Sequence, residues 1–383
     1  MQYRHISSLN IDVSAYGIGC MRLPLRQLDQ GKTDPALINE KEAIRMIRKG
    51  IDAGVNYIDT AYPYHEKQSE PLVAKALENG YRDKVYLASK MPVWETHSYE
   101  DFEKMLDLQL QQLQTDKIDF YLLHALNEES WPRVRDLGIL KFLDKAKEAG
   151  KIVYAAFSFH DELPLFKEII DAYDWDMAQI QYNLLDEHYQ AGVEGLRYAT
   201  DKDIMTVIME PLRGGALAQK VPVGINRVWD EASVKRRPVE WAFRWLADQP
   251  EPGVILSGPS SVEQLEDSLR IFSDLKPGCL SDDEKALTAR VQKLYHNKVK
   301  VGCTACNYCM PCPYGVNIPG VFSLYNNIFL FDEEKESKQA YQKLIKDETD
   351  ASQCTECGQC EPLCPQNIQI IAKLKEAHQA LTG

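Results

Sequence analysis

The chain has 383 residues, a formal net charge of −13 at pH 7 and ten cysteines. This length predicts two domains, because a domain averages about 150 residues and a barrel takes up about 250. The negative charge argues against nucleic acid or an anionic membrane surface as a partner, since both would repel the chain. The first residues, MQYRHISSLN, lack the apolar core of a signal peptide, and the apolar stretch 318–331 is interrupted by Asn326 and Asn327. We therefore expect a cytoplasmic protein with no membrane segment.

Residues 1–14 are predicted to form a hairpin, and after it short apolar or β-branched runs alternate with amphipathic stretches. In chain order, the predicted strand and helix pairs are 15–19 and 40–53, 55–60 and 68–79, 85–89 and 100–114, 119–123 and 138–149, 152–157 and 161–172, 178–182 and 189–200, 204–209 and 233–248, and 253–256 and 261–272. In the first of these helices, Ala43, Met46 and Ile47 share one face while Glu40 and Lys41 lie outside it.

Eight such pairs predict an α/β fold, a (β/α)8 barrel over residues 1–280, with the hairpin closing its N-terminal end. The alternative is a doubly wound sheet, which binds a dinucleotide through GxGxxG after its first strand. The corresponding segment here is GIGCMR, residues 17–22, which departs from that pattern at the final glycine. The barrel is the better interpretation.

Catalytic residues of such barrels lie at the carboxyl ends of the strands, where three polar segments stand out. They are DTAYPYH with Asp59 and Tyr64, LASK ending at Lys90, and LLH ending at His124. A phenol is a poor acid at neutral pH, but a nearby ammonium stabilises the phenolate and a carboxylate keeps that ammonium charged. A histidine beside them can orient a carbonyl oxygen. Each residue alone also has a structural explanation, as a cap, a loop aromatic, a solvated strand end or a core histidine.

Together, Asp59, Tyr64, Lys90 and His124 match in order and strand position the catalytic tetrad of the aldo-keto reductases, which the chain resembles over about residues 1–275. The resemblance implies hydride transfer between NAD(P)H and the carbonyl group of a small-molecule substrate. It also implies that Tyr64 donates the proton, that Lys90 and Asp59 tune the acidity of Tyr64, and that His124 positions the substrate.

The resemblance further implies that NAD(P)H lies extended across the barrel mouth. The implied contacts are Cys20, Met21 and Arg22 on the first strand; Ser158 and Gln179 near the carboxamide; Met209, Pro211, Leu212, Arg213, Gly214 and Gly215 in IMEPLRGG, the last four at the pyrophosphate; and Gly258, Ser260, Gln264 and Asp267 near the adenosine. Arg213 is either a cofactor contact or the ion-pair partner of Glu210, and His160 and His188 are either substrate contacts or surface histidines.

Several of these positions depart from the family pattern. Phe159 stands where an asparagine often follows the serine, and Met209 where an aromatic residue often stacks on the nicotinamide. Gly258 and Gln264 replace the lysine and arginine that grip a 2′-phosphate in many members. Both NADH and NADPH therefore stay open as the cofactor.

Eight of the ten cysteines form two runs, CTACNYCMPCP at 303–313 and CTECGQCEPLCP at 354–365. The second run has the bacterial ferredoxin spacing, in which three thiolates bind one [4Fe–4S] cluster and the fourth binds its neighbour. The last gap of the first run is one residue shorter. We predict two clusters, one held by Cys303, Cys306, Cys309 and Cys364, the other by Cys312, Cys354, Cys357 and Cys360. A pair of zinc sites is the alternative. The two remaining cysteines, Cys20 and Cys279, are not expected to bind a metal or a cluster.

Between the two runs, apolar residues recur at helical spacing in 321–329 and 341–345. Residues 281–383 therefore resemble an α-helical two-cluster ferredoxin domain. Three hypotheses follow for the clusters: they are structural, they carry single electrons between a redox partner protein and the barrel, or they report redox state in a nucleotide-binding sensor without turnover. We favour an enzyme in which the clusters transfer electrons.

Overall fold

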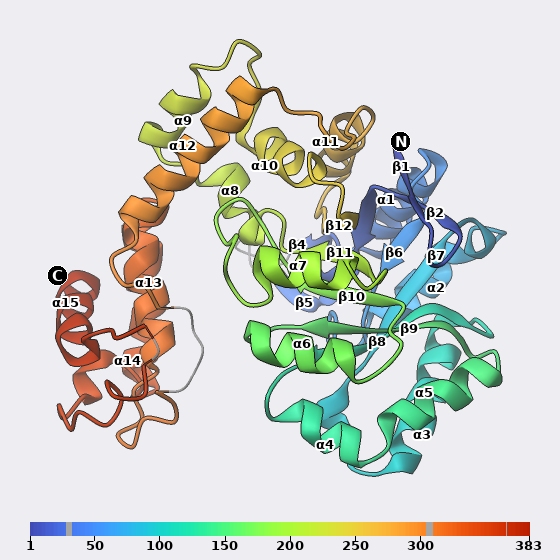
Figure 1. Cartoon of the computed structure of the whole chain (residues 1–383), viewed down its shortest axis with the longest axis horizontal. Helices are drawn as coiled ribbons and strands as arrows, with labels where there is room; N and C mark the ends of the chain where they lie inside the picture. The colour runs from blue at the N-terminus through green and yellow to red at the C-terminus, as the bar shows by residue number, and fades with distance from the viewer. Residues whose placement is uncertain (28–32, 304–308, 365) are drawn as a thin grey trace. The chain divides into compact units, whose positions relative to one another are not determined.

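The protein is described by a computed structural model covering residues 1–27, 33–303, 309–364 and 366–383. Its contacts divide the chain into two compact units (Figure 1). The first unit contains residues 1–212 and 242–280, and the second contains residues 213–241 and 281–383. The segment 213–241 thus groups with the C-terminal helices rather than with the barrel, where the sequence had assigned it.

Eight parallel strands of the first unit close into a barrel, which confirms the predicted fold. They follow chain order around it, and the last strand pairs with the first through Ile255 and Tyr16. The strands are β3 (Tyr16–Gly19), β6 (Tyr57–Asp59), β7 (Tyr86–Met91), β8 (Ile118–Leu126), β9 (Ile152–Phe159), β10 (Met177–Gln181), β11 (Met205–Met209) and β12 (Pro252–Ser257). Each overlaps one strand predicted from the sequence.

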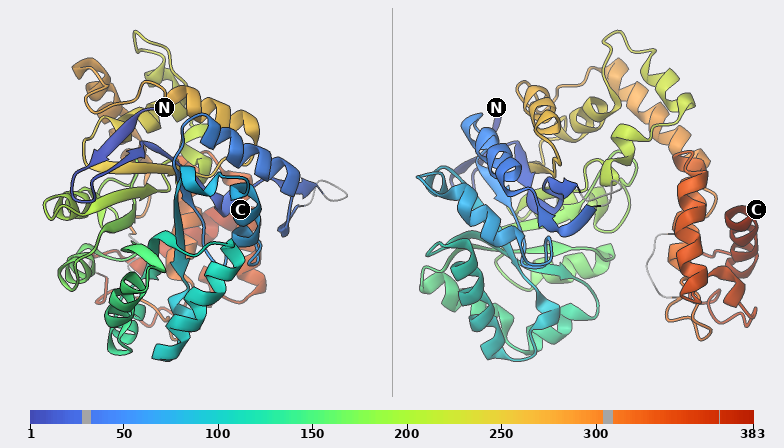
Figure 2. Two further views of the ribbon diagram at one scale, coloured as in Figure 1. Left: turned by 90° about the vertical axis from the view of Figure 1, so that its right-hand side faces the viewer. Right: turned by 180° about the vertical axis from the view of Figure 1, so that it is seen from behind.

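The helices that alternate with these strands also match the prediction (Figure 2). They are α1 (Glu40–Asp52), α2 (Ser69–Leu77), α3 (Tyr99–Leu113), α5 (Ile139–Glu148), α6 (Leu163–Asp171), α7 (Gly192–Thr200), α10 (Pro238–Ala247) and α11 (Val262–Ile271). The antiparallel pair β4 (Leu25–Gln27) and β5 (Thr33–Ile38), and the helix α4 (Ser130–Asp136), were not predicted. Such short elements hold too few residues to show a period.

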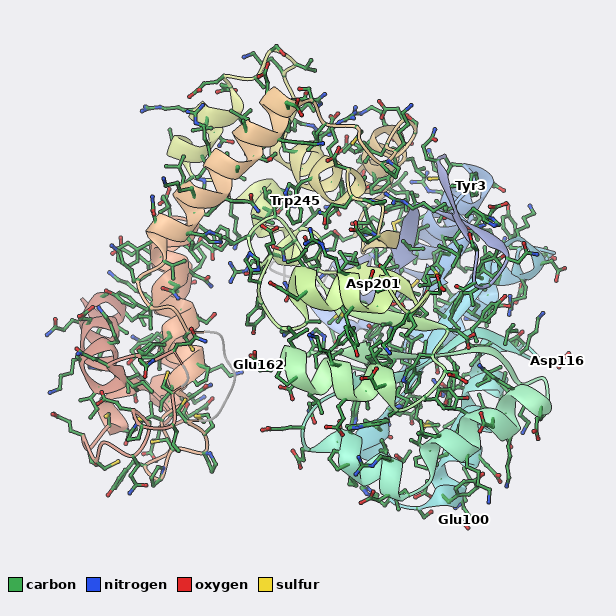
Figure 3. The ribbon with its side chains drawn as sticks, viewed as in Figure 1. Tyr3, Glu100, Asp116, Glu162, Asp201 and Trp245 are labelled. Atoms are coloured by element: carbon green, nitrogen blue, oxygen red, sulfur yellow. The ribbon has the colours of Figure 1, made fainter. Side chains whose placement is uncertain are left out.

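The predicted N-terminal hairpin is present as the antiparallel strands β1 (Tyr3–Ile6) and β2 (Ile11–Ser14). Its residues Ile6, Leu9 and Ile11 pack against an apolar cluster inside the barrel that includes Met177 and Met205, the first residues of their strands. The hairpin therefore covers the amino ends of the strands. Figure 3 labels both ends, with Asp116 just before β8 and Glu162 just after β9.

The second unit is helical. It contains α8 (Ala216–Gln219), α9 (Val223–Trp229), α12 (Asp282–Lys298), α13 (Ile318–Leu330), α14 (Glu334–Lys346) and α15 (Ile370–Thr382). Val321, Tyr325 and Tyr341, which belong to the two predicted helical stripes, are buried in its core with Leu374. None of the helices in the described ranges is long and apolar enough to cross a membrane.

Candidate active site and cysteine-lined cavity

Four predicted catalytic side chains meet at the carboxyl ends of β6, β7 and β8. Lys90 on β7 is buried, and its Nζ donates to Asp59 Oδ1 at 2.7 Å and to the carbonyl oxygen of Thr60 at 2.9 Å. The same Nζ donates to Tyr64 Oη at 3.3 Å. Because β6 and β7 are neighbouring strands in parallel register, their ends bring the carboxylate and the ammonium together.

The fourth side chain, His124 on β8, lies beside Tyr64, with ring centroids 6.0 Å apart and planes at 78°. Its other neighbour is Trp94, 5.1 Å away between centroids, in the short helix η4 (Val93–Glu95). Among the described residues, no group accepts from or donates to the buried Nδ1 of His124. Sequence reasoning missed Trp94, which is 45% exposed and forms one wall beside the histidine.

Burial is the largest single influence on the pKa of each of these groups. It raises the pKa of Asp59, and Lys90 opposes that rise. Burial would lower the pKa of Lys90, but Asp59 and Tyr64 raise it overall, so the ammonium stays charged. The pKa of Tyr64 is also raised, because burial outweighs the lowering effect of Lys90. The prediction that Lys90 makes this phenol more acidic overall is therefore wrong, although Lys90 does lower the pKa of Tyr64 as predicted.

The pKa of His124 lies well below its ordinary value, first because of burial and then because of the positive charge of Lys90 and the nearby His160. The imidazole is therefore neutral at pH 7. A neutral imidazole has one donor and one acceptor nitrogen, so it can hydrogen-bond an uncharged oxygen without adding a proton to it.

The first group of predicted cofactor contacts lies around this mouth. Cys20, Met21 and Arg22 form the short helix η1, in which Cys20 is buried and Met21 is exposed. Ser158 on β9 accepts the backbone N–H of Ala125 at 2.8 Å. Gln179 on β10 is buried, and its Oε1 has no partner among the described residues.

The second group lies in the loop after β12, with Gly258 and Ser260, and on α11, with Gln264 and Asp267. A Cβ at Gly258 would sit 3.3 Å from the carbonyl oxygen of Gly19, so a larger residue would crowd these two backbones, which glycine lets approach closely. Ser260 donates to Gln264 Oε1 through its backbone N–H at 3.0 Å and its hydroxyl at 3.2 Å. Asp267 accepts from Arg270 at 3.1 Å.

The third group follows β11 along the chain, and its members belong to different units. Met209 ends β11, and Pro211 and Leu212 are among the last residues of the first unit before the segment 213–241. Arg213, Gly214 and Gly215 form η5 of the second unit, all with positive φ. The guanidinium of Arg213 lies 5.5 Å from the ring centroid of Phe331.

Sequence reasoning also missed a buried polar network behind Lys90. Glu70 on α2 is fully buried, and its Oε1 accepts from Ser89 Oγ at 2.5 Å and from Gln109 Nε2 at 2.7 Å. Gln109 also donates to the carbonyl oxygen of Lys90 at 3.0 Å and accepts from the Tyr121 hydroxyl at 2.7 Å. The signal in the sequence was a carboxylate on the face of α2 that also carries Val73 and Leu77.

In the second unit, five cysteines line one cavity of about 100 Å³: Cys309, Cys312, Cys354, Cys357 and Cys360. It thus brings Cys312 together with the three cysteines predicted to share its cluster. Cys303 and Cys364 pack against the apolar core, and Cys306 lies outside the described residues. No three side chains of metal-ligating type meet closely enough within the described ranges to hold a single ion. Thiolates around a shared space suit an iron–sulfur cluster.

A (β/α)8 barrel with a buried lysine–carboxylate pair, a tyrosine and a histidine at its catalytic rim has the architecture of a barrel oxidoreductase. Residues 17–278, more than half of the chain, match the Aldo/keto reductase family. The chain therefore belongs to this family of oxidoreductases. Residues 302–369 match the 4Fe-4S dicluster domain, which favours iron–sulfur ligation over the zinc alternative.

Individual proteins agree with the match to the Aldo/keto reductase family. The aldo-keto reductase YhdN of Bacillus subtilis is 27% identical over 302 residues, which cover 70% of this chain and 87% of the relative. The aldo-keto reductase AKR11C1 from Bacillus halodurans in its holo form is 22% identical, with a TM-score of 0.63 over 76% of this chain and 96% of that one. An aldo-keto reductase from Klebsiella pneumoniae in complex with NADPH is 21% identical, with a TM-score of 0.60 over 76% and 96% of the two chains.

Proposed function

We propose that the barrel catalyses NAD(P)H-dependent reduction of a carbonyl group, or the reverse reaction. The observation that carries the proposal is the buried Nζ of Lys90, which donates at once to Asp59 Oδ1 and to Tyr64 Oη. That arrangement places a charged ammonium against the phenol oxygen of Tyr64, which could exchange a proton with a substrate. The solved Klebsiella relative that contains NADPH supports this choice of cofactor class.

Unpartnered polar atoms at the mouth fit a nicotinamide and a carbonyl oxygen. Gln179 Oε1 can accept from a carboxamide, and the neutral ring of His124 can hydrogen-bond the substrate oxygen. When bound, NAD(P)H supplies a hydride to the carbonyl carbon. Within the first unit, we propose that the cofactor is held by the η1 residues, by Ser158 and by the loop at Gly258.

The chain's own residues control the proton. Because the pKa of Tyr64 is raised, its phenol holds its proton at neutral pH and can donate that proton to the substrate oxygen. The phenolate left behind is stabilised by Lys90 at 3.3 Å, and Asp59 keeps Lys90 charged and fixed. His124 holds the oxygen near Tyr64 without competing as an acid.

Tyr64→Phe tests this assignment, because it removes only the hydroxyl. We expect kcat for carbonyl reduction to fall at least about 100-fold, the usual contribution of a general acid, with NAD(P)H affinity nearly unchanged. Tyr62→Phe is the matched control, since Tyr62 lies two residues away and contacts Lys67 instead. Turnover of the Tyr64 variant at the wild-type rate across a carbonyl panel would remove Tyr64 from the mechanism.

We also propose that the second unit binds two [4Fe–4S] clusters, with the ligand sets predicted from the sequence. One cavity is lined by Cys312, Cys354, Cys357 and Cys360, which supports one of these sets, and Cys309 of the other set lines it as well. Cys357 is exposed, which suits electron exchange with a redox partner protein. Anaerobically purified protein should contain about eight iron and eight sulfide per chain and show cluster bleaching on reduction. Zinc in place of iron would refute this part of the proposal.

A further inference from the structure

The loop that carries Tyr64 has an unusual backbone. The three residues after it, His65, Glu66 and Lys67, have φ angles of 53°, 52° and 69°, although none of them is glycine. Side chains with a Cβ disfavour this left-handed region, and three consecutive residues there persist only where surrounding contacts hold them. The contacts that hold this loop therefore matter for the position of Tyr64.

One such contact comes from His65 itself. Its side chain is buried, and its Nε2 accepts the backbone N–H of Leu23 at 3.1 Å. Because Nε2 is the acceptor, the ring is neutral and carries its proton on Nδ1. Leu23 is also buried and follows directly after η1, so without His65 its N–H would lose this partner in a place that water does not reach.

A second contact joins the same two segments. The Ser69 hydroxyl, at the start of α2, donates to the carbonyl oxygen of Cys20 at 3.2 Å. On its other side, η1 lies against Gly258, where a Cβ would come within 3.5 Å of the Cβ of Arg22. The helix η1 is thus held between the loop of Tyr64 and the loop of Gly258.

We propose that His65 is a positioning residue that locks the Tyr64 loop to the cofactor-binding segment Cys20–Arg22. The hydrogen bond of His65 then helps to couple the placement of the proton donor to the binding of the nicotinamide cofactor. The inference rests on the proposed function for its cofactor, but the hydrogen bond between His65 and Leu23 exists without it.

The test compares His65→Gly, His65→Gln and Glu66→Gly in the full-length protein. Glycine accepts the positive φ and removes the acceptor, whereas the Gln side chain can place an oxygen near the former Nε2. Glu66→Gly relaxes the same loop at an exposed residue and leaves the His65 acceptor of the Leu23 N–H in place. Dissociation constants for NADH and NADPH are measured by fluorescence titration, and exchange of the Leu23 amide is followed by hydrogen–deuterium exchange.

We expect His65→Gly to bind the cofactor about tenfold more weakly and to expose the Leu23 amide to exchange. His65→Gln should restore most of both properties, and Glu66→Gly should change neither. Unchanged Leu23 exchange in His65→Gly would overturn the proposal, and so would equal weakening by His65→Gly and Glu66→Gly. If the wild-type protein binds neither nucleotide, the proposed function fails, and the exchange measurement still decides whether His65 locks the loop.

Discussion

Glu70→Gln replaces a fully buried carboxyl group by an uncharged amide of nearly the same shape. In the wild type, burial raises the pKa of Glu70 from 4.5 to about 7, against the lowering effects of Ser89, Gln109 and Lys90. The folded protein therefore binds this proton more tightly than the unfolded chain does. Stability is fully present below pH 4.5 and falls as the pH rises to about 7, because over that range the unfolded chain ionises while the buried carboxyl group keeps its proton.

The size of the effect follows from the two pKa values. Between pH 5 and pH 8, ionisation of Glu70 should cost the wild type roughly 2.5 kcal/mol of unfolding free energy, at about 1.36 kcal/mol per pKa unit. The glutamine variant lacks this loss. Its buried amide nitrogen also lacks a hydrogen-bond acceptor, because Glu70 Oε2 has no partner among the described residues, but that penalty does not vary with pH.

Urea unfolding of both proteins under nitrogen, followed by tryptophan fluorescence at several pH values, measures the difference. We expect the stability of Glu70→Gln relative to the wild type to rise by roughly 2.5 kcal/mol from pH 5 to pH 8. Glu78→Gln, an exposed substitution at the end of the same helix, should show no such trend. A constant offset between Glu70→Gln and the wild type over this range would refute the reasoning.

Two other substitutions test buried polar contacts. Lys90→Met should lower the unfolding free energy by about 3–5 kcal/mol in urea titrations, because it leaves Asp59 buried without a cation. The double variant Lys90→Met, Asp59→Asn should recover much of that loss, and equal stability of the single and double variants would contradict the assignment. Asn326→Leu should destabilise the second unit by about 3 kcal/mol, because it removes the bonds of Asn326 to the backbone of Lys300 and Val301 at 2.8–3.0 Å. Thermal unfolding followed at the cluster absorbance measures this effect, and an equal shift in Asn327→Leu would argue against it.

Asn326 shows where local sequence patterns stop being informative. In the sequence it only interrupts an apolar stretch. In the structure its side-chain amide forms hydrogen bonds with the backbone of Lys300 and Val301, just before the first cysteine run. Glu70 is a similar case, because its partners Ser89 and Gln109 are 19 and 39 residues away along the chain. No periodicity or spacing could reveal these contacts, because they depend on which elements pack together.

The sequence alone determined the barrel and the identity of the four residues at its mouth. Strands and helices have different hydrophobic periods, and all carboxyl ends of a parallel barrel face the same rim, so Asp59, Lys90 and His124 could be assigned to one site from their positions at strand ends. The cysteine runs were equally informative, because thiolate ligands of a cluster must be closely spaced.

Only the tertiary structure decided the protonation of the site and the contacts that hold it. Whether Tyr64 is more or less acidic than a free phenol depends on how deeply it is buried, and that burial reversed the net shift expected from its lysine neighbour. The bond between His65 and Leu23 joins residues 42 positions apart. Desolvation and hydrogen-bond partners arise when distant segments meet, so they become defined only after the chain has folded.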